Sequence, residues 1–305
     1  MSEPLRQRLQ TLREQVDQRL PQMLCLADGC PASLLEAMRY SLLAPGKRLR
    51  PTLVILTCEA CRGSTDQAMP AACAVEMVHA YSLVHDDLPA MDNDDLRRGQ
   101  PTTHKKFGEG MAILAGDALL TLAFQVLASE YPPATAAAGC RELALCAGAI
   151  GMVGGQVNDL TWEGKIPGRT GHGTLQDLEN VHTRKTGALF RACVRLGMLA
   201  AQGENSGGLN REMQQGLEAY AACFGLAFQV TDDLLDVESD AGTTGKRVRK
   251  DASSGKLTYP GLLGVEESRR RLHQLRRDAE EALRPLGDSA KALTDLMAMI
   301  VERSN

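Results

Sequence analysis

Two long apolar stretches of this chain each run directly into a cluster of aspartates, and this pattern constrains the fold most strongly. Residues 74–84 are largely apolar and are followed by five carboxylates within residues 86–95. Residues 219–230 are again apolar, and three aspartates follow within residues 232–236. A helix that is apolar on nearly all sides belongs in the interior, so acids at its end lie at the mouth of a pocket.

A solvated acidic surface is the ordinary alternative, because runs of charge are usually exposed. The apolar flanks argue against it. Carboxylates that are clustered beside buried helices must take up protons or bind cations.

The spacing of the aspartates suits a shared cation in both clusters. In an unbroken helix Asp86 and Asp92 would point about 240° apart. Pro89 disfavours helical geometry at the residue before it, so the helix is predicted to end or kink there, and the break can let both carboxylates face one ion. Asp232 and Asp236 lie at positions i and i+4, on one face of a helix. Ligands that are all oxygen favour Mg²⁺ over zinc.

Composition favours an all-α protein. Hydrophobic residues make up 44% of the chain but aromatic residues only 4%, and Ala, Leu, Gly and Met favour close-packed helices over sheets. A chain of 305 residues is long enough for one or two domains. Because no stretch resembles an interdomain linker, we predict a single domain over residues 1–305.

Apolar periodicity, together with Gly and Pro breakers, predicts where the helices lie. The sequence predicts them near residues 4–20, 31–43, 52–61, 70–88, 110–129, 139–156, 175–202 and 211–237, with two amphipathic helices after a polar stretch at 238–256.

Charge and cysteine usage exclude several classes. A net charge of -4 gives no basic field for a nucleic acid. The nine cysteines are odd in number and scattered through apolar segments, which predicts a reducing, cytoplasmic setting without disulfides. Cys58 and Cys61 form a lone CxxC that is best explained by packing. The sequence predicts neither a signal peptide nor a membrane span.

Six basic residues are placed near turns beside the predicted helices. They are Lys47, Arg50, Arg97, Arg98, Lys185 and Lys246. Any one of them alone would be interpreted as a surface charge. Beside two metal motifs they favour recognition of a diphosphate, because Arg forks match phosphate oxygens and Lys adds point charge. Two glycine-lysine segments, 242–246 and 254–257, do not fit the nucleotide-binding pattern GxxxxGK[ST].

An ordered set of motifs runs through the chain. They are GKRLRP at 46–51, HDDLPAMDNDDLRRG at 85–99, THKKFGE at 103–109, ILAGDALL at 113–120, GGQVNDL at 154–160, HTRKTGALF at 182–190, FQVTDDLLD at 228–236 and GKLTYPGLLG at 255–264. With these motifs the chain resembles the trans-isoprenyl diphosphate synthases, most closely the bacterial farnesyl diphosphate synthases, nearly from end to end. The resemblance implies an isoprenoid-synthase-like helical bundle around a deep central cavity, usually a homodimer, with both aspartate motifs facing each other across the cavity mouth.

The resemblance also implies roles for individual residues. The expected Mg²⁺ ligands are Asp86, Asp92 and Asp232, with Asp236 in support. About three Mg²⁺ ions are expected in each site once substrate is bound, and Mn²⁺ can substitute. The expected catalytic residues are Asp86, Asp92, Arg97, Lys185 and Asp232.

Two diphosphates are implied as substrates. The residues expected to clamp the allylic diphosphate are Arg97, Lys185 and Lys246. Those expected to hold isopentenyl diphosphate are Lys47, Arg50, His79 and Arg98. Thr186 and Gln229 are expected to line the allylic end. Without the resemblance, His79 would be interpreted as a core histidine.

The reaction implied is head-to-tail (1'-4) condensation of isopentenyl diphosphate with dimethylallyl and geranyl diphosphates to give (E,E)-farnesyl diphosphate. Tyr81 and Ser82 are the expected chain-length residues, because Tyr81 lies about 7.5 Å before Asp86 along the helix, where an aromatic ring can form a floor. In the family, such an aromatic and two extra residues in the first motif accompany farnesyl products, and both are present. Asn93 departs from the bacterial farnesyl pattern and matches plant-like geranylgeranyl synthases.

Three other functions are alternatives to this one. A geranylgeranyl or geranyl diphosphate synthase of the same family is the nearest alternative. A terpene cyclase binds only one diphosphate, which would leave the second set of basic residues unexplained. A non-catalytic partner subunit would have lost acids or clamps, and this chain has kept them.

Overall fold

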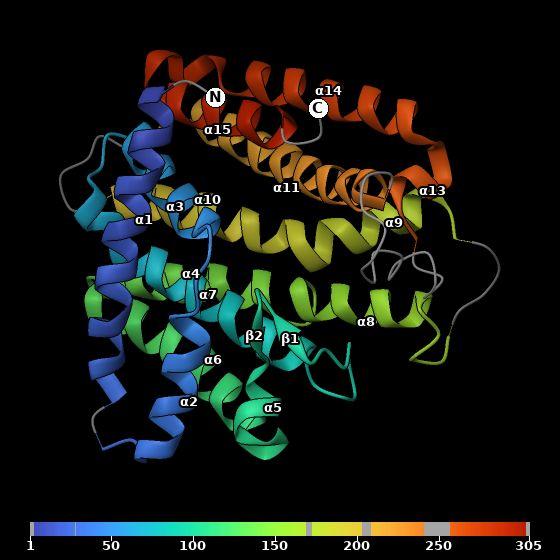
Figure 1. Ribbon diagram of the computed structural model, residues 1–305. Helices are drawn as coiled ribbons and strands as arrows, with labels where there is room; N and C mark the ends of the chain where they lie inside the picture. The colour runs from blue at the N-terminus through green and yellow to red at the C-terminus, as the bar shows by residue number, and fades with distance from the viewer. Residues whose placement is uncertain (1–2, 28, 169–172, 203–208, 241–256, 303–305) are drawn as a thin grey trace. The chain divides into compact units, whose positions relative to one another are not determined.

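Figure 1 shows a computed structural model that describes residues 3–27, 29–168, 173–202, 209–240 and 257–302. These residues are almost entirely helical, which confirms the predicted all-α class. They form two compact units, which are described separately. The N-terminal unit comprises residues 6–143 and 196–206, and the C-terminal unit comprises residues 1–5, 144–195 and 207–305. The single domain remains a prediction.

The N-terminal unit is built around helix α4. Its elements are α1 (Glu3–Met23), η1 (Leu24–Ala27), α2 (Ala32–Leu42), α3 (Leu49–Ala60), α4 (Thr65–Asp86), α5 (Thr103–Phe107), α6 (Glu109–Glu130) and most of α7 (Pro133–Ala147). Helix α4 packs against α2, α3 and α6, and 14 of its 22 residues are buried. The expectation that this apolar helix is interior is therefore confirmed.

The ends of α4 follow from local sequence. Ser64 and Gln67 form a reciprocal capping box at its start, in which each side chain bonds the backbone of the other residue. The helix ends at Asp86, as the position of Pro89 predicts. Because α4 ends at Asp86, the rest of the first aspartate motif lies outside the helix and can fold back on it.

A two-residue antiparallel hairpin follows this motif and was not expected from the sequence. Strands β1 (Leu96–Arg97) and β2 (Gln100–Pro101) are joined by a turn at Arg98 and Gly99, whose φ angles are 53° and 78°. Positive φ at both central residues is the type I′ geometry of tight hairpins. The turn places Arg98 at the tip of the hairpin.

The C-terminal unit is built around α11. Its elements are α8 (Met152–Trp162), α9 (Leu175–His182), the π-helical turn η2 (Thr183–Gly187), α10 (Ala188–Ala201, which ends in the other unit), α11 (Arg211–Asp240), α13 (Tyr259–Leu263), α14 (Val265–Ala282), η3 (Arg284–Ala290) and α15 (Lys291–Glu302). Helix α11 packs against α14 and α15, and η2 packs against α8, α9 and α11.

Two of the predicted apolar stretches are interrupted. The stretch at 139–156 contains the end of α7 and the start of α8, and the stretch at 175–202 is divided by η2. Gly151 explains the first interruption. Its backbone is non-helical, and a Cβ there would lie 2.0 Å from the carbonyl oxygen of Cys146. Only glycine fits this close approach.

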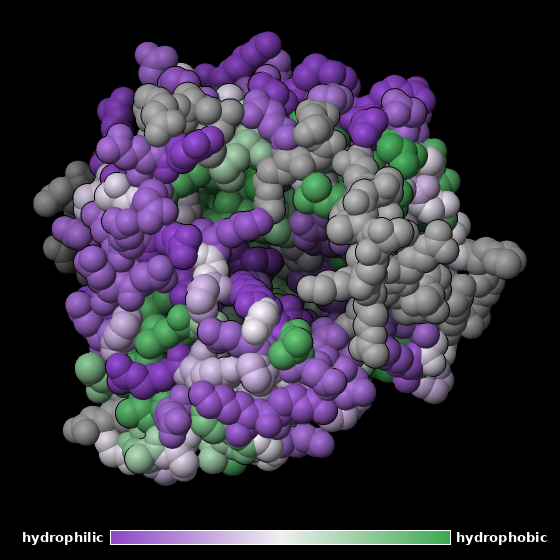
Figure 2. Space-filling model, in the orientation of Figure 1, coloured by the Kyte–Doolittle hydropathy of each residue, from purple (hydrophilic) through white to green (hydrophobic). Residues whose placement is uncertain are grey.

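Two helical segments are long and apolar enough to cross a membrane, namely Glu109–Glu130 and Pro133–Trp162. By itself this is weak evidence, because core helices pass the same test, and 44% and 39% of an apolar 18-residue window in each segment are buried. Figure 2 shows that hydrophilic residues cover much of one face of the molecule, with smaller hydrophobic groups among them.

Candidate functional site

A cluster of arginines surrounds His79 on α4 of the N-terminal unit. Arg50 Nη1 lies 3.5 Å from His79 Nε2. Burial, followed by the charges of Arg50, Arg98, Arg97 and Arg48, lowers the pKa of His79 well below its ordinary value. The structure therefore brings together three of the four residues expected to hold isopentenyl diphosphate, around a histidine that stays neutral.

Arg98 is held against the loop that carries the fourth of these residues, Lys47. Its Nη1 donates a hydrogen bond of 2.7 Å to the carbonyl oxygen of Pro45. A Cβ on Gly46 would lie 2.6 Å from the same Nη1, so a glycine makes room for the guanidinium. Lys47 comes next in the chain and is exposed. These contacts define a basic cluster of Lys47, Arg50, Arg98 and the histidine.

Burial and the neighbouring arginine charges lower the pKa of His79, so we expect it to remain uncharged well below the pH near 6.5 at which an ordinary histidine titrates. The unfolded chain takes up a proton there that the native protein does not, so this residue reduces stability as the pH falls below about 6.5 and has no such effect above it. NMR of labelled histidine, assigned by the signal lost in His79→Gln, measures the titration. A midpoint near 6.5 would contradict the enclosed, arginine-ringed environment.

The first aspartate motif folds back on the end of α4. The backbone N–H of Asp92 donates to the carbonyl oxygen of Asp86 at 2.8 Å, which places the two residues side by side. Asn93 follows with φ 52°, a left-handed conformation that asparagine tolerates well. Both aspartates are partly exposed. The predicted break at Pro89 thus brings the two expected metal ligands close together.

Asp87, the second aspartate of the motif, has a different role that sequence reasoning missed. It is 3% exposed, and its Oδ1 accepts hydrogen bonds from Nε and Nη2 of Arg97, both at 2.7 Å. Successive residues on a helix point about 100° apart, so Asp87 faces away from its neighbour Asp86. This aspartate holds Arg97, which is one of the expected clamps for the allylic diphosphate.

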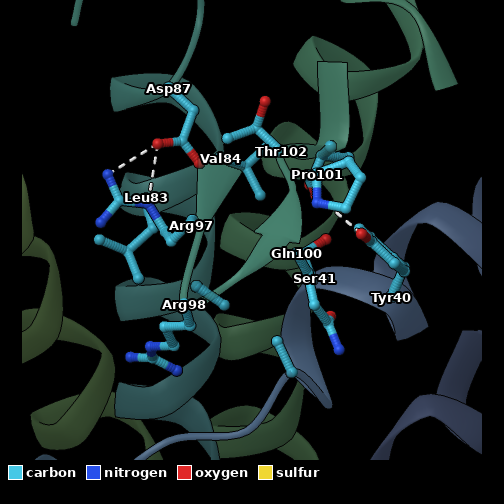
Figure 3. A pocket seen from close by; sticks show the side chains of 13 residues that line it. Tyr40, Ser41, Leu83, Val84, Asp87, Arg97, Arg98, Gln100, Pro101 and Thr102 are labelled. Atoms are coloured by element: carbon cyan, nitrogen blue, oxygen red, sulfur yellow. Dashed lines mark hydrogen bonds and ion pairs between the residues drawn. The ribbon is translucent and has the colours of Figure 1, made fainter. Parts of the chain in front are cut away.

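Behind this pair lies a pocket of about 430 Å³, counting the part that opens to solvent. Figure 3 shows Asp87 and Arg97 on one side of it and Arg98 below them. Tyr40 from α2 closes the other side, where its hydroxyl donates to the carbonyl oxygen of Pro101 at 2.7 Å. The pocket therefore lies on the side of α4 that Asp87 faces, between α2 and the hairpin.

The second aspartate motif repeats this division of roles on α11 of the C-terminal unit. Asp232 and Asp236 are one helical turn apart and are at least partly exposed. Asp233 is 7% exposed, accepts a hydrogen bond from the backbone N–H of Tyr259 at 2.9 Å and lies 3.4 Å from Nε2 of His182. In both motifs the second aspartate, Asp87 or Asp233, is buried and accepts hydrogen bonds from the protein, whereas the expected metal ligands are at least partly exposed.

Lys185, another expected clamp, lies in the π-helical turn η2 of the C-terminal unit. Its Nζ pairs with Oδ2 of Asp159 on α8 at 2.5 Å. Gly155, one turn earlier on α8, permits the approach, since a Cβ there would lie 2.1 Å from the backbone nitrogen of Lys185. Thr186, the next residue, is buried. Nε2 of Gln229 on α11 lies 3.5 Å from Nδ1 of His182. Single-turn π-helices often mark functional sites.

The aspartates suit Mg²⁺, which needs only a few protein ligands, better than an ion that is bound by protein side chains alone. Within the described residues there is no group of three or more His, Cys, Asp or Glu side chains that could hold a metal by itself. Mg²⁺ is usually held by one or two carboxylates, with water and substrate phosphate supplying the other oxygens. The pairs Asp86 with Asp92 and Asp232 with Asp236 each offer two carboxylates of this kind.

The remaining expected residues have the following places. Tyr81 is 6% exposed on α4, and Ser82 next to it donates to the carbonyl oxygen of His79 at 2.8 Å. Lys246 lies outside the described residues. The clamps and ligands are divided between the units, with seven expected residues around α4 and five around α11. They are Lys47, Arg50, His79, Asp86, Asp92, Arg97 and Arg98 in one, and Lys185, Thr186, Gln229, Asp232 and Asp236 in the other.

Comparisons with known proteins agree with this arrangement of motifs. A model of the polyprenyl synthetase family matches residues 31–294. The chain is 45% identical over 305 residues to the farnesyl diphosphate synthase of Escherichia coli (strain K12), covering 98% of each. It is 48% identical over 282 residues to the chloroplastic geranylgeranyl pyrophosphate synthase 11 of Arabidopsis thaliana, covering 90% of this chain and 76% of that protein.

A solved structure gives the same answer for the fold. The FPP/GFPP synthase from Zymomonas mobilis matches with a TM-score of 0.85 at 36% identity, covering 99% of this chain and 100% of that one. Its helical fold, of the isoprenoid synthase class, is shared by this protein. The chain therefore belongs to the polyprenyl synthetase family and is an enzyme of the prenyltransferase type.

Proposed function

We propose that the protein joins isopentenyl diphosphate head to tail to dimethylallyl and geranyl diphosphates and releases (E,E)-farnesyl diphosphate. The observation that carries this proposal is the basic cluster around neutral His79. It lies on the same helix as Asp86, about 10 Å away at 1.5 Å per residue. The basic cluster can hold one diphosphate with cationic side chains alone. A second diphosphate can be bound elsewhere, through metal ions held by the aspartates. A condensing enzyme needs two such places.

The protein's own residues have distinct tasks in this reaction. Arg97 and Lys185, fixed by Asp87 and Asp159, hold the allylic diphosphate as it departs. Divalent ions at the expected metal ligands of both motifs supply further positive charge when bound. The isopentenyl double bond then attacks the allylic carbocation, and the released diphosphate is the base that takes the proton.

The farnesyl product rests on the position of Tyr81. Its ring is buried on α4 and meets the ring of His85 edge on, with centroids 5.6 Å apart. A buried aromatic at this depth supports a short cavity. A geranylgeranyl product is the second candidate, because Asn93 matches the plant-like pattern and the Arabidopsis relative bears that name.

We further propose a cytoplasmic homodimer that folds as a single domain. Helix α6 exposes Ile113 and Leu114, whose side chains are 44% and 56% exposed, and a partner copy would cover them. Nine cysteines scattered through apolar segments favour a reducing compartment. A single family model matches residues 31–294, which supports one domain.

Incubation of the purified chain with Mg²⁺, isopentenyl diphosphate and each allylic primer tests the proposal. We expect farnesyl diphosphate from both dimethylallyl and geranyl primers, and no product when a chelator removes the metal. Chromatography of the dephosphorylated products measures chain length. Cyclic products without consumption of isopentenyl diphosphate would indicate a terpene cyclase, and complete inactivity of the chain alone would indicate a partner subunit. Either result would refute the proposed function.

A further inference from the structure

Arg48 lies between two expected substrate-binding residues, Lys47 and Arg50, but its side chain is turned into the protein. Only 5% of it is exposed. Its backbone has φ 48° and ψ 37°, and it forms the N-cap of α3. This left-handed conformation is uncommon for residues other than glycine, and it persists only where the surroundings hold it. The surroundings of Arg48 must therefore fix its place.

The guanidinium of Arg48 joins three segments of the N-terminal unit. Nε donates to Oδ1 of Asp17 on α1 at 2.7 Å, and Nη1 donates to Oε1 of Glu76 on α4 at 2.6 Å. Nη2 donates to the carbonyl oxygen of Ala44 at 3.0 Å, in the loop before Lys47. Glu76 is itself only 4% exposed. One planar fork thus fastens the loop to two helices at once.

The contact between Arg48 and Glu76 also fixes how the basic cluster is aligned along α4. Glu76 and His79 are three residues apart on α4 and so share one face of the helix. Arg48 reaches Glu76, and two residues later Arg50 reaches His79 at 3.5 Å. Two parallel contacts therefore align the start of α3 with α4.

Charge explains why this anchor is an ion pair. Burial disfavours the charged guanidinium, but Glu76 and Asp17 outweigh burial and raise the pKa of Arg48 above its ordinary value. Two carboxylates beside Arg48 balance a positive charge that would otherwise add to the repulsion within the basic cluster. Buried ion pairs contribute little net stability, because desolvation offsets their attraction, and fixing a unique geometry is their best attested use.

We propose that Arg48 is a positioning residue for the isopentenyl diphosphate subsite. Through Glu76 and Asp17 it holds the segment with Lys47 and Arg50 in the place where these two bind the diphosphate, and it does not touch the substrate. The inference rests on the proposed function for the identity of that anion.

Kinetics of Arg48→Gln test this role. The KM for isopentenyl diphosphate is expected to rise about tenfold or more, because small displacements of binding groups are costly, while the KM for the allylic primer stays within about twofold. Asp17→Asn leaves the pair with Glu76 in place, and it is expected to fold and to raise the same KM by a smaller factor. Equal changes in both KM values, or no change in either variant, would overturn the inference.

A double variant separates positioning from stability. Arg48→Met with Glu76→Leu replaces the buried pair by apolar side chains, which commonly restores the stability that a single replacement loses. We expect its thermal midpoint to recover relative to Arg48→Met alone, while the KM for isopentenyl diphosphate stays high. Recovery of that KM together with the midpoint would show a purely structural role and overturn the proposal.

Arg8→Ala is the matched control, because the ion pair of Arg8 with Glu59 also joins α1 to another helix of this unit but lies at the surface. Its KM values are expected to equal those of the wild type. Calorimetric binding of isopentenyl diphosphate gives a readout that does not need turnover. A wild type that neither binds nor consumes this substrate refutes the proposed function together with the inference. A wild type that does both, beside an Arg48→Gln variant of unchanged affinity, refutes the inference alone.

Discussion

Replacing Asp86 or Asp232 by alanine is expected to lower turnover by about 10³-fold or more while the protein stays folded. Each substitution removes one of the two expected metal ligands of its motif. A departing diphosphate is then left without part of the positive charge that stabilises it in the transition state. Both side chains are partly exposed, Asp86 at the end of α4 and Asp232 within α11, so little packing is lost. Steady-state rates across a Mg²⁺ titration measure the loss, and the thermal midpoint reports folding.

Asp95→Ala provides the matched control for these variants. Asp95 belongs to the same acidic cluster, but its side chain is 71% exposed and pairs with Lys105 at 2.8 Å. An exposed pair of this kind is worth at most about 1 kcal/mol, so rate and midpoint are expected to match the wild type. Near-normal rates from Asp86→Ala or Asp232→Ala would refute the metal assignment. A comparable loss from Asp95→Ala would show that the whole cluster acts by charge alone.

The features that the sequence predicted well are local ones. Pro89 disfavours helical geometry at the residue before it, so the end of α4 could be predicted from the sequence. The return of Asp92 towards Asp86 follows from this end. The apolar residues before each motif correctly placed α4 and α11 as core helices, because burial follows from composition along one helix. The basic residues near the motifs predict an anion site, and the structure brings Arg50 close to His79.

The features that were missed depend on partners far along the chain. Arg48 pairs with Asp17 across 31 positions, and Asp233 pairs with the backbone of Tyr259 across 26. Nothing in a local pattern selects such partners, since tertiary packing decides them. One signal was available for the second aspartate of each motif. Adjacent residues on a helix point about 100° apart, so two neighbouring aspartates cannot both face the same ion.

Glycines illustrate the same limit. Nothing in the sequence distinguishes Gly46 and Gly155 from other glycines of the motifs, and neither has a positive φ. The reason for glycine at these positions is seen only in the folded protein. A Cβ on Gly46 would lie 2.6 Å from Nη1 of Arg98, and a Cβ on Gly155 would lie 2.1 Å from the backbone nitrogen of Lys185. Close approach between segments is a property of the folded chain. Sequence reasoning therefore predicts a chemistry for the site but not the residues that hold it in shape.

Tyr81→Ala is expected to change the main product from farnesyl diphosphate to a chain longer by at least one isoprene unit. The ring is 6% exposed, and burial, followed by the charge of Asp86, raises the pKa of its hydroxyl to about 12. The phenol therefore stays neutral and acts by its size. Truncation to alanine would open space about 7.5 Å below Asp86, where a growing apolar chain would descend. Mass spectrometry of the dephosphorylated products measures the shift.

Tyr81→Phe separates the bulk of the ring from its hydroxyl, and this variant is expected to keep the wild-type product. It retains the edge-on contact with His85, so the proposed floor under the growing chain is unchanged. Ser82→Ala is expected to have a smaller effect, because the hydroxyl of Ser82 is bound to the carbonyl oxygen of His79. If Tyr81→Ala left product length unchanged while turnover persisted, another residue would form the floor. A wild type that already made geranylgeranyl diphosphate would show that this tyrosine does not stop elongation at the farnesyl stage.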